Sequence, residues 1–170
     1  MEQLAPVMEK GSVVSSSRIR HFVEQGGVDV AARMLGRLHF CDGDIVRGDG
    51  RGAGLGFPTA NMDLPETLLP PRGVYASRLS VDGACYEAVT NLGSNPTFGG
   101  RKVSVESFAL DAPGDMDLYG RRARVHFVKQ LRRETRFSGP EELAAQIARD
   151  VEQARGIVPD VQPFAASGER

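Results

Sequence analysis

The pattern of apolar and polar residues changes twice along this chain. From residue 38 to about residue 130, short apolar runs are separated by Gly, Pro, Asn and Asp, which is typical of strands joined by turns. The runs with the length of a strand are FCDGDIVRG, RGVYASRLSV, ACYEAVTNL, KVSVESFAL and RRARVHFVKQL. Since no helical pattern separates them, we expect a mainly β domain, built as an antiparallel barrel or sandwich.

One connection in this region is specified by its own residues. Val81-Asp82-Gly83-Ala84 joins the runs RGVYASRLSV and ACYEAVTNL. Because Asp-Gly suits the positive φ angles of a tight primed turn, the sequence predicts a β-hairpin at this position.

Helical patterns flank the β region on both sides. Before it, a run of serines at 15–17 offers N-caps for a helix through RIRHFVEQ, which Gly26 and Gly27 would end. VDVAARML adds one or two helical turns up to Gly36. We therefore expect a short helical N-terminal extension.

After the β region, SGPEELAAQIARDVEQARG has the period of an amphipathic helix. Ser138 and Glu141 have capping-box spacing, Pro140 lies in the first turn, and Gly156 can end the helix. Its apolar stripe consists of Leu143, Ile147, Val151 and Ala154. We expect this helix to pack over one face or end of the barrel, and residues 159–170 to form a flexible tail.

Composition limits the classes of function. The chain has 170 residues, a net charge of −1, and 41% hydrophobic and 25% charged residues, which is ordinary for one globular domain. The near-neutral charge does not indicate a general affinity for nucleic acid or an anionic membrane. No apolar run approaches the roughly 20 residues of a membrane-spanning helix. Cys41 and Cys85 lack metal-ligand or redox spacing, so we expect free thiols in the core and a cytoplasmic location.

A glycine-rich stretch, GDGRGAGLGFPTAN, is the first candidate for chemistry. Its glycines allow main-chain N–H groups to face phosphate oxygens, and Arg51 adds a cation suited to phosphate. The stretch is not a Walker A loop, and no helix follows it as in a Rossmann turn. A flexible hairpin loop is the alternative interpretation. The alternating glycines are Gly48, Gly50, Gly52, Gly54 and Gly56.

Thr59 and Asn61, at the end of this stretch, are candidate metal ligands. Residues two apart in an extended backbone point to the same side, so both side-chain oxygens would face one point. Mg²⁺ accepts such neutral oxygens when phosphates and waters supply the remaining ligands. A turn in which these side chains bond their own backbone is equally compatible with the residues alone.

Glu106 is the candidate base. In VSVESFAL it shares one strand face with Phe108 and Leu110, which is unusual for a carboxylate. A partly buried carboxylate beside a phosphate site can accept a hydroxyl proton during phosphoryl transfer. The alternative is a glutamate on an edge strand that reaches solvent or pairs with an arginine.

Two further segments have open interpretations. NLGSNPTFGG, at residues 91–100, is turn-rich and is either a plain connection or a flap over a pocket. FVKQLRRETRF is strongly cationic, which is usual for a solvated face.

The order of these segments resembles the riboflavin kinase family over roughly residues 37–158. The matching segments are GDGRGAGLGFPTAN, RGVYA, NLGSNPTFGG, VESFALD, DLYG, LRRETRF and ELAAQIARDVEQA. The resemblance implies a six-stranded antiparallel Greek-key β-barrel with a C-terminal α-helix. It also implies transfer of the ATP γ-phosphate to the 5′-hydroxyl of riboflavin, giving FMN, with Mg²⁺. ATP is the donor expected for the family, although distant relatives use CTP.

The resemblance also implies residue roles. Glu106 would be the catalytic base, and Thr59 and Asn61 the magnesium ligands. The ATP-binding residues would be Gly48, Gly50, Arg51, Gly52, Gly56, Pro58, Thr59 and Asn61. The flavin-binding or flap residues would be Asn95, Pro96, Thr97, Arg132, Glu134 and Phe137. Two positions depart from the family pattern, because Ala53 stands where many relatives have arginine and Arg133 where proline is frequent.

Residues 1–36 carry a separate resemblance. VSSSRIRHFVEQGGVDVAARMLGR resembles the end of the adenylyltransferase half of bifunctional riboflavin kinase/FAD synthetases. The HxGH signature of that half is absent, so we do not expect FAD synthesis. The expected organisation is an N-terminal stub at 1–36, a kinase module at 37–158 and a tail at 159–170, with riboflavin and ATP as partners. A non-catalytic flavin- or nucleotide-binding module is the alternative, and a barrel binding single-stranded nucleic acid has little support, since only 6% of residues are aromatic.

Overall fold

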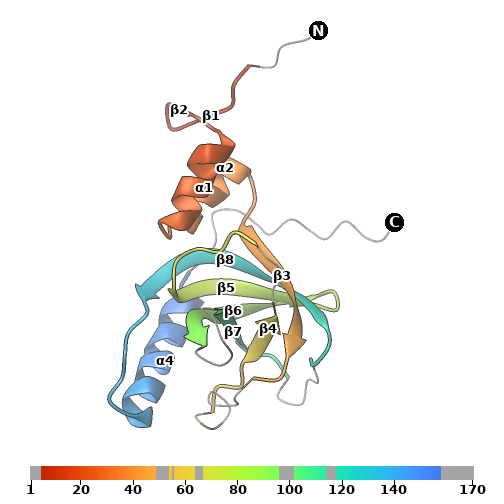
Figure 1. The fold of residues 1–170 in the computed structure, drawn as a ribbon, viewed down its shortest axis with the longest axis vertical. Coiled ribbons are helices and arrows are strands. Elements are labelled where there is room, and N and C mark those ends of the chain that lie inside the picture. Colours follow the sequence, from red (N-terminus) through yellow and green to blue (C-terminus); the bar gives the residue numbers. More distant parts are fainter. Residues whose placement is uncertain are drawn as a thin grey trace.

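A computed structural model describes residues 5–48, 54, 56–63, 67–95, 102–113 and 118–157. Its centre is a closed barrel in which every neighbouring pair of strands is antiparallel (Figure 1). The strands, in barrel order, are β3 (His39–Val46), β4 (Ala60–Asp63), β7 (Lys102–Ala109), β6 (Ala84–Asn95), β5 (Gly73–Val81) and β8 (Arg122–Arg133). Because β8 returns beside β5 after three consecutive strands, the topology is a Greek key, as expected.

Local sequence signals explain much of this framework. Asp82 and Gly83 have φ angles of 48° and 81°, and Val81 pairs with Ala84, so the predicted primed hairpin is confirmed. The turn-rich residues 93–95, predicted as part of a loop, instead continue β6. Their backbone pairs with the start of β7, and this long-range pairing outweighs their local turn preference.

The barrel interior holds the main core. Alternate residues of each strand point inward, including Tyr75, Leu79 and Phe127, all fully buried. Three buried hydroxyls cross β5, β6 and β7 among these apolar residues. Ser77 and Thr90 lie 2.7 Å apart, and Thr90 and Ser107 lie 2.8 Å apart, so each hydroxyl is satisfied without water.

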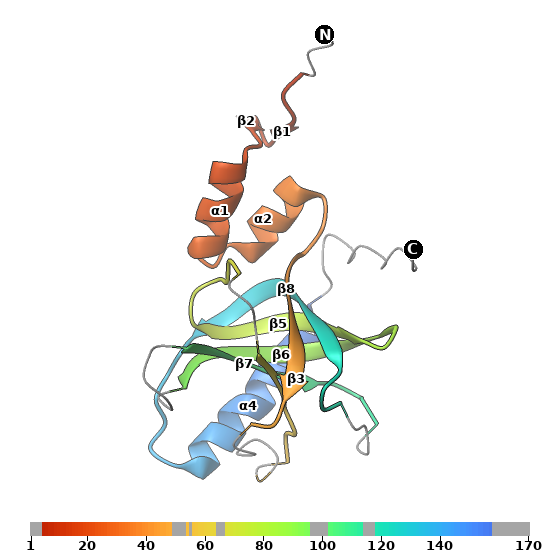
Figure 2. The same cartoon turned by 45° about the vertical axis from the view of Figure 1, so that its right-hand side comes forward.

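Helix α4 (Pro140–Arg155) covers the outer face of the barrel next to β5 and β6 (Figures 1 and 2). Val151 and Ala154 pack in a second core cluster with outward-facing residues such as Val74 and Ala76. The predicted apolar stripe therefore does face the barrel. Strand β5 is buried on both faces because one faces the barrel interior and the other this cluster.

The predicted capping box of α4 is wrong in detail. The N-cap is Gly139, and the Ser138 N–H and hydroxyl both donate to Glu142, at 2.9 and 2.6 Å. The helix begins one residue later than the box requires, so Glu142 rather than Glu141 reaches back. These bonds lower the pKa of Glu142, because they favour its ionised form.

The N-terminal segment forms a small hairpin, β1 (Met8–Glu9) with β2 (Ser12–Val13), and two helices, α1 (Ser16–Glu24) and α2 (Val28–Leu35). Ser15 caps α1 by accepting the Arg18 N–H, and Gly36 ends α2 with a φ of 67°, as predicted. Helix α2 is joined to the barrel, since Val28 is fully buried in the core cluster that holds Tyr75 and Phe127.

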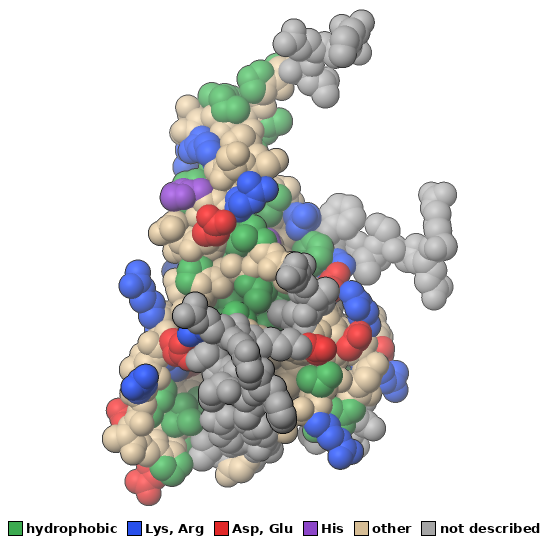
Figure 3. All heavy atoms as spheres, in the orientation of Figure 1, with side chains coloured by type: hydrophobic (Ala, Val, Ile, Leu, Met, Phe, Trp, Pro, Cys, Tyr) green, Lys and Arg blue, Asp and Glu red, His purple; other side chains and the backbone are tan. Residues whose placement is uncertain are grey.

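The surface has mixed charge (Figure 3), and the two cysteines differ in burial. On the face in Figure 3, acidic and basic side chains are interspersed over the barrel. Cys41 and Cys85 are both free, but Cys85 is exposed, so the prediction of a core thiol is wrong at that position. Cys41 is buried, and burial raises the pKa of its thiol to about 12. Among the described residues, no helix combines the length and the apolar character needed to cross a membrane. Residues 159–170, predicted as a tail, lie outside the described part of the chain.

Candidate functional site

Three polar residues lie side by side across adjacent strands of the barrel. Glu106 on β7 is directly opposite Asn61 on β4 and Asn91 on β6. Directly opposed residues of antiparallel strands project to the same face, and Val105 and Ser107, on either side of Glu106, are buried on the inner side. Glu106 and the two asparagines therefore share the outer face. Because β7 pairs on both sides, Glu106 does not lie on an edge strand.

A cavity of about 280 Å³ opens over this face, between β6, β7 and α4. Its volume is close to that of the smallest typical ligand pockets, which is about 300 Å³. The segment just before β4, strands β5 to β8, the segment after β8, and α4 all contribute to its wall. The lining residues are Phe57, Thr59, Val74, Val89, Asn91, Gly93, Ser104, Glu106, Phe108, Arg132, Glu134, Thr135, Phe137, Leu143, Ile147 and Asp150.

Much of the wall is apolar and suits a flat ring system. Phe57 and Phe108 meet edge to face, with ring centroids 5.4 Å apart and an interplanar angle of 88°. Leu143 and Ile147 line the cavity from α4. The apolar stripe of α4 therefore has two parts, since its first half lines the cavity and its second half, from Val151, packs on the barrel.

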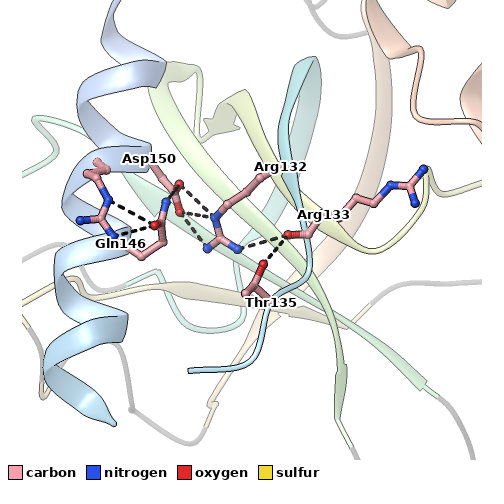
Figure 4. Close-up of polar contacts among 6 residues, drawn as sticks. Arg132, Arg133, Thr135, Gln146 and Asp150 are labelled. Carbon is pink, nitrogen blue, oxygen red and sulfur yellow. Dashed lines mark hydrogen bonds and ion pairs between the residues drawn. The ribbon is translucent and has the colours of Figure 1, made fainter. Parts of the chain in front are cut away.

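A buried ion pair closes the polar side of the cavity (Figure 4). Arg132, at the end of β8, donates from Nε and Nη2 to the Asp150 carboxylate of α4 at 2.9–3.0 Å. Gln146 donates to the same carboxylate at 2.8 Å. Asp150 is only 2% exposed, so these donors, rather than water, compensate its negative charge. The cationic segment expected to be a solvated face thus places Arg132 in the cavity wall.

Most described residues of the predicted site come together here. Thr59, Glu106, Arg132, Glu134 and Phe137 all line the one cavity. Asn61 is not in its wall but stands next to Glu106 in the sheet.

The glycine-rich stretch is described in part. Gly48 lies against the Asn61 side chain, because a Cβ at position 48 would be 2.2 Å from Asn61 Nδ2. Pro58 is exposed beside Thr59, and Gly56 has a φ of 86°, which favours glycine. For Asn95 only the backbone, at the end of β6, is described. Gly50, Arg51, Gly52, Pro96 and Thr97 lie outside the described residues.

The site includes residues that were not predicted from the sequence. Asn91 and Asp150 supply polar groups, and Phe57 and Phe108 form part of the apolar wall. Asp150 had a detectable signal, because it falls seven residues after Leu143, within the apolar stripe of α4. An acidic residue at such a position faces the core and requires a cationic partner.

The donor set fits a hard cation. Among the described residues, no group of three or more His, Cys, Asp or Glu side chains could hold a transition metal. Thr59 and Asn61 offer neutral oxygens on the side of the sheet where Glu106 adds a carboxylate. The Asn61 Nδ2 donates to the Thr59 carbonyl at 3.4 Å, so the turn-type bond of the alternative interpretation exists, yet it leaves Oδ1 for another partner.

Comparisons with known proteins agree on the kinase module. The bifunctional riboflavin kinase/FMN adenylyltransferases of Bacillus subtilis and Escherichia coli K12 are 36% and 38% identical to this chain over 148 residues. In each case the match covers 86% of this chain and 47% of the relative. The chain therefore spans about half the length of the curated relatives that it matches.

Solved structures are similar as well, and two of them illustrate the likeness. One from Streptococcus pneumoniae, titled a macrolide-efflux protein, has a TM-score of 0.83 and 32% identity, covering 90% of this chain and 50% of that one. The riboflavin kinase of Trypanosoma brucei has a TM-score of 0.53 and 24% identity, covering 68% and 74%, and supports the fold. The family model for riboflavin kinase, also called flavokinase, matches residues 35–158. With its Greek-key barrel, this chain belongs to the riboflavin kinase family.

Proposed function

We propose that this protein transfers the γ-phosphate of ATP to the 5′-hydroxyl of riboflavin, producing FMN. The observation that carries this proposal is the placement of Glu106, in register with Asn61 and Asn91, at the wall of a largely apolar cavity. The cavity suits a flat aromatic ring, and the carboxylate beside it suits a hydroxyl that must lose a proton. ATP and riboflavin are the substrates of the family to which the chain belongs.

Glu106 is the proposed general base. A primary alcohol is a weak nucleophile at neutral pH. Its ionised form, the alkoxide, would be repelled by the negatively charged triphosphate. A carboxylate within hydrogen-bond reach can orient the ribityl hydroxyl and accept its proton as the new O–P bond forms. Its position on a strand that is paired on both sides restricts its movement, which favours a fixed line of attack.

Thr59 and Asn61 are the proposed holders of Mg²⁺. When bound, this ion neutralises phosphate charge that would otherwise oppose transfer. Gly48 belongs to the same arrangement, since its main chain is packed against the Asn61 side chain. The remaining nucleotide-binding residues proposed are Gly50, Arg51, Gly52, Gly56 and Pro58.

The flavin ring is proposed to occupy the slot between the strands and α4. Phe108 and Ile147 would contact its apolar part and exclude water. Arg132 and Glu134 would meet its polar edge, with Phe137 beside them, and Asn95, Pro96 and Thr97 would belong to the flap. Closure of the cavity around the ring also limits hydrolysis of ATP by water.

The wider setting follows as part of the same proposal. Residues 1–36 are proposed to correspond to the end of an adenylyltransferase domain, and residues 37–158 to the kinase module. Nucleic acid is not expected as a partner, and the cytoplasm is the proposed location.

The test is an assay of FMN formation. Purified protein is incubated with riboflavin and Mg-ATP, and FMN is separated by chromatography. Glu106→Gln should bind riboflavin but lose about 10²–10⁴ in rate, as expected when a base is removed. No FMN from the unaltered protein, with riboflavin still bound, would indicate a non-catalytic flavin module. A Glu106→Gln rate within a few-fold of the parent would show that another group is the base.

A further inference from the structure

We propose that Asp150 is a positioning residue of the flavin site, which acts by holding the Arg132 guanidinium in the cavity wall as a preset hydrogen-bond donor. The inference rests on the proposed function, because it assigns a role in recognising the flavin. Asp150 reaches the site from α4, so the C-terminal helix takes part in recognition as well as in packing.

The guanidinium is held at three points (Figure 4). Nε and Nη2 of Arg132 donate to Asp150, and Nη1 donates to the Arg133 carbonyl at 3.2 Å. A guanidinium has five N–H donors, so these bonds leave one N–H on each terminal nitrogen. Two N–H donors fixed at a cavity wall suit the carbonyl oxygens and ring nitrogens along the polar edge of an isoalloxazine.

The Asp150 carboxylate is itself held in place by other residues of α4. Gln146, one turn earlier on α4, donates from its side chain to Asp150 at 2.8 Å, and Arg149 donates to the side-chain oxygen Oε1 of Gln146 at 2.8 and 3.2 Å. The orientation of Arg132 is thus set by a chain of contacts that begins on the helix surface. A long, flexible side chain loses its rotamer freedom before substrate arrives, which reduces the entropy lost on binding.

The pair also organises the segment between β8 and α4. Thr135 donates to the same Arg133 carbonyl, at 3.4 Å, that accepts from Arg132. The Phe137 ring lies 5.5 Å from the Arg132 guanidinium carbon. Thr135 and Phe137 both line the cavity. Loss of Asp150 would therefore change the positions of several wall residues, and not only that of the Arg132 donors.

A second ion pair of α4 shows why packing alone does not account for Asp150. Arg155 binds Asp111, just after β7, at 2.6 and 2.8 Å, with side chains 44% and 73% exposed. The Arg132 and Asp150 side chains are 21% and 3% exposed. Burying a charge pair carries a desolvation cost that an exposed pair avoids, so helix attachment does not require the buried one.

The experiment compares these two pairs in steady-state assays and in riboflavin binding followed by quenching of flavin fluorescence. Asp150→Asn should raise the riboflavin KM and Kd about tenfold while kcat and the KM for Mg-ATP stay within about threefold. Arg132→Lys keeps the positive charge but not the planar set of donors, so it should raise the riboflavin KM and Kd to the same extent. The double variant should be no worse than either single one, because both remove one interaction. Asp150→Glu should recover part of the affinity.

Asp111→Asn is the matched control and should leave the riboflavin KM unchanged. An Asp150→Asn variant with the parental riboflavin KM, or effects of the two substitutions that simply add, would overturn the proposal. If Asp150→Asn does not fold, Gln146→Ala decides in its place, because it removes a donor that fixes the Asp150 carboxylate and leaves Arg132 unaltered. A parental riboflavin KM in Gln146→Ala would then overturn the proposal. Failure of the unaltered protein to form FMN would count against the proposed function, whereas FMN formation with an unchanged KM in these variants counts only against Asp150.

Discussion

Gly48 lies so close to Asn61 that no other residue fits at position 48 without displacement. An added Cβ would stand 2.2 Å from Nδ2, 2.3 Å from Cγ and 2.5 Å from Oδ1 of Asn61. The glycine thus serves a close approach between two segments, rather than an unusual φ angle. It also links the glycine-rich stretch directly to a proposed metal ligand.

Gly48→Ala should therefore impair the use of Mg-ATP. The new methyl group must push the Asn61 amide aside, and a displacement of about 1 Å at a reacting site can cost about 10²-fold in rate. We expect kcat/KM for Mg-ATP to fall at least about tenfold, with little change in thermal stability, because Gly48 is exposed. Gly54→Ala is the control, since nothing lies within 4 Å of a Cβ there. Equal activity in the two variants would refute the coupling.

Asn61→Ala should raise the Mg²⁺ concentration needed for activity. The substitution removes the side-chain oxygen proposed as a ligand but leaves the strand pairing of residue 61 with Glu106 intact. A titration of initial rate against Mg²⁺ at fixed ATP is the measurement, with about a tenfold higher midpoint expected. A midpoint equal to that of the parent protein would show that Asn61 is not a ligand.

Two residues of the same helical stripe should separate binding from stability. Ile147 lines the cavity, whereas Val151 packs in the second core cluster. Ile147→Ala should weaken riboflavin binding about tenfold, because it removes apolar contact with the ring. Val151→Ala should instead lower the free energy of unfolding by about 1 kcal/mol, with riboflavin affinity unchanged. Riboflavin affinity is measured by fluorescence titration and stability by urea unfolding, for both variants. Weaker riboflavin binding in Val151→Ala, together with lower stability alone in Ile147→Ala, would contradict this division.

Stability should fall in mild acid because of His126. Burial, followed by the nearby charge of Arg124, lowers the pKa of this buried histidine from 6.5 to about 4. Between these values the unfolded chain binds a proton that the folded protein does not, so stability decreases as pH falls through this window. The full effect is on the order of 3 kcal/mol, and His126→Gln should remove much of it.

Urea unfolding at about pH 7.5 and about pH 5 measures this dependence. His39, whose pKa is also lowered by burial, should leave a smaller residual slope in His126→Gln. A parental slope in His126→Gln would mean that another group is responsible.

The N-terminal helices should contribute to the stability of the barrel. Val28 on α2 is fully buried with barrel residues, so Val28→Ala leaves a cavity in the main core. We expect the free energy of unfolding to fall by about 2 kcal/mol, in one cooperative transition. Val13→Ala, at a position 46% exposed, should change it by less than about 0.5 kcal/mol. Separate unfolding of helices and barrel would contradict the joint core.

Short-range patterns predicted much of the framework. The runs that became β3, β5, β6, β7 and β8, the Asp82-Gly83 hairpin, and the ends of α1 and α2 at glycines all follow from local residue preferences. Glu106 stood out because a carboxylate shared a strand face with apolar residues. These signals depend on neighbours within a few positions, which the linear sequence displays.

The resemblance to the family predicted which residues belong to the site, but not which contacts position them in this chain. Asn91 was not predicted, because its place beside Glu106 depends on the pairing of β6 with β7. Asp150 was not predicted either, although an acidic residue in an apolar stripe was visible. Its partner Arg132 lies on another element, and only the packing of α4 on the barrel brings the two together.

The linear order of residues by itself determined the strands, the turns and the chemical types available for a site, because backbone conformational preferences and side-chain period act over a few residues. The tertiary structure alone decided the register that sets Asn61 opposite Glu106, the cavity under α4, and the contact of Gly48 with Asn61. Barrel closure and helix packing depend on the simultaneous fit of segments far apart in the chain, and no local pattern specifies that fit.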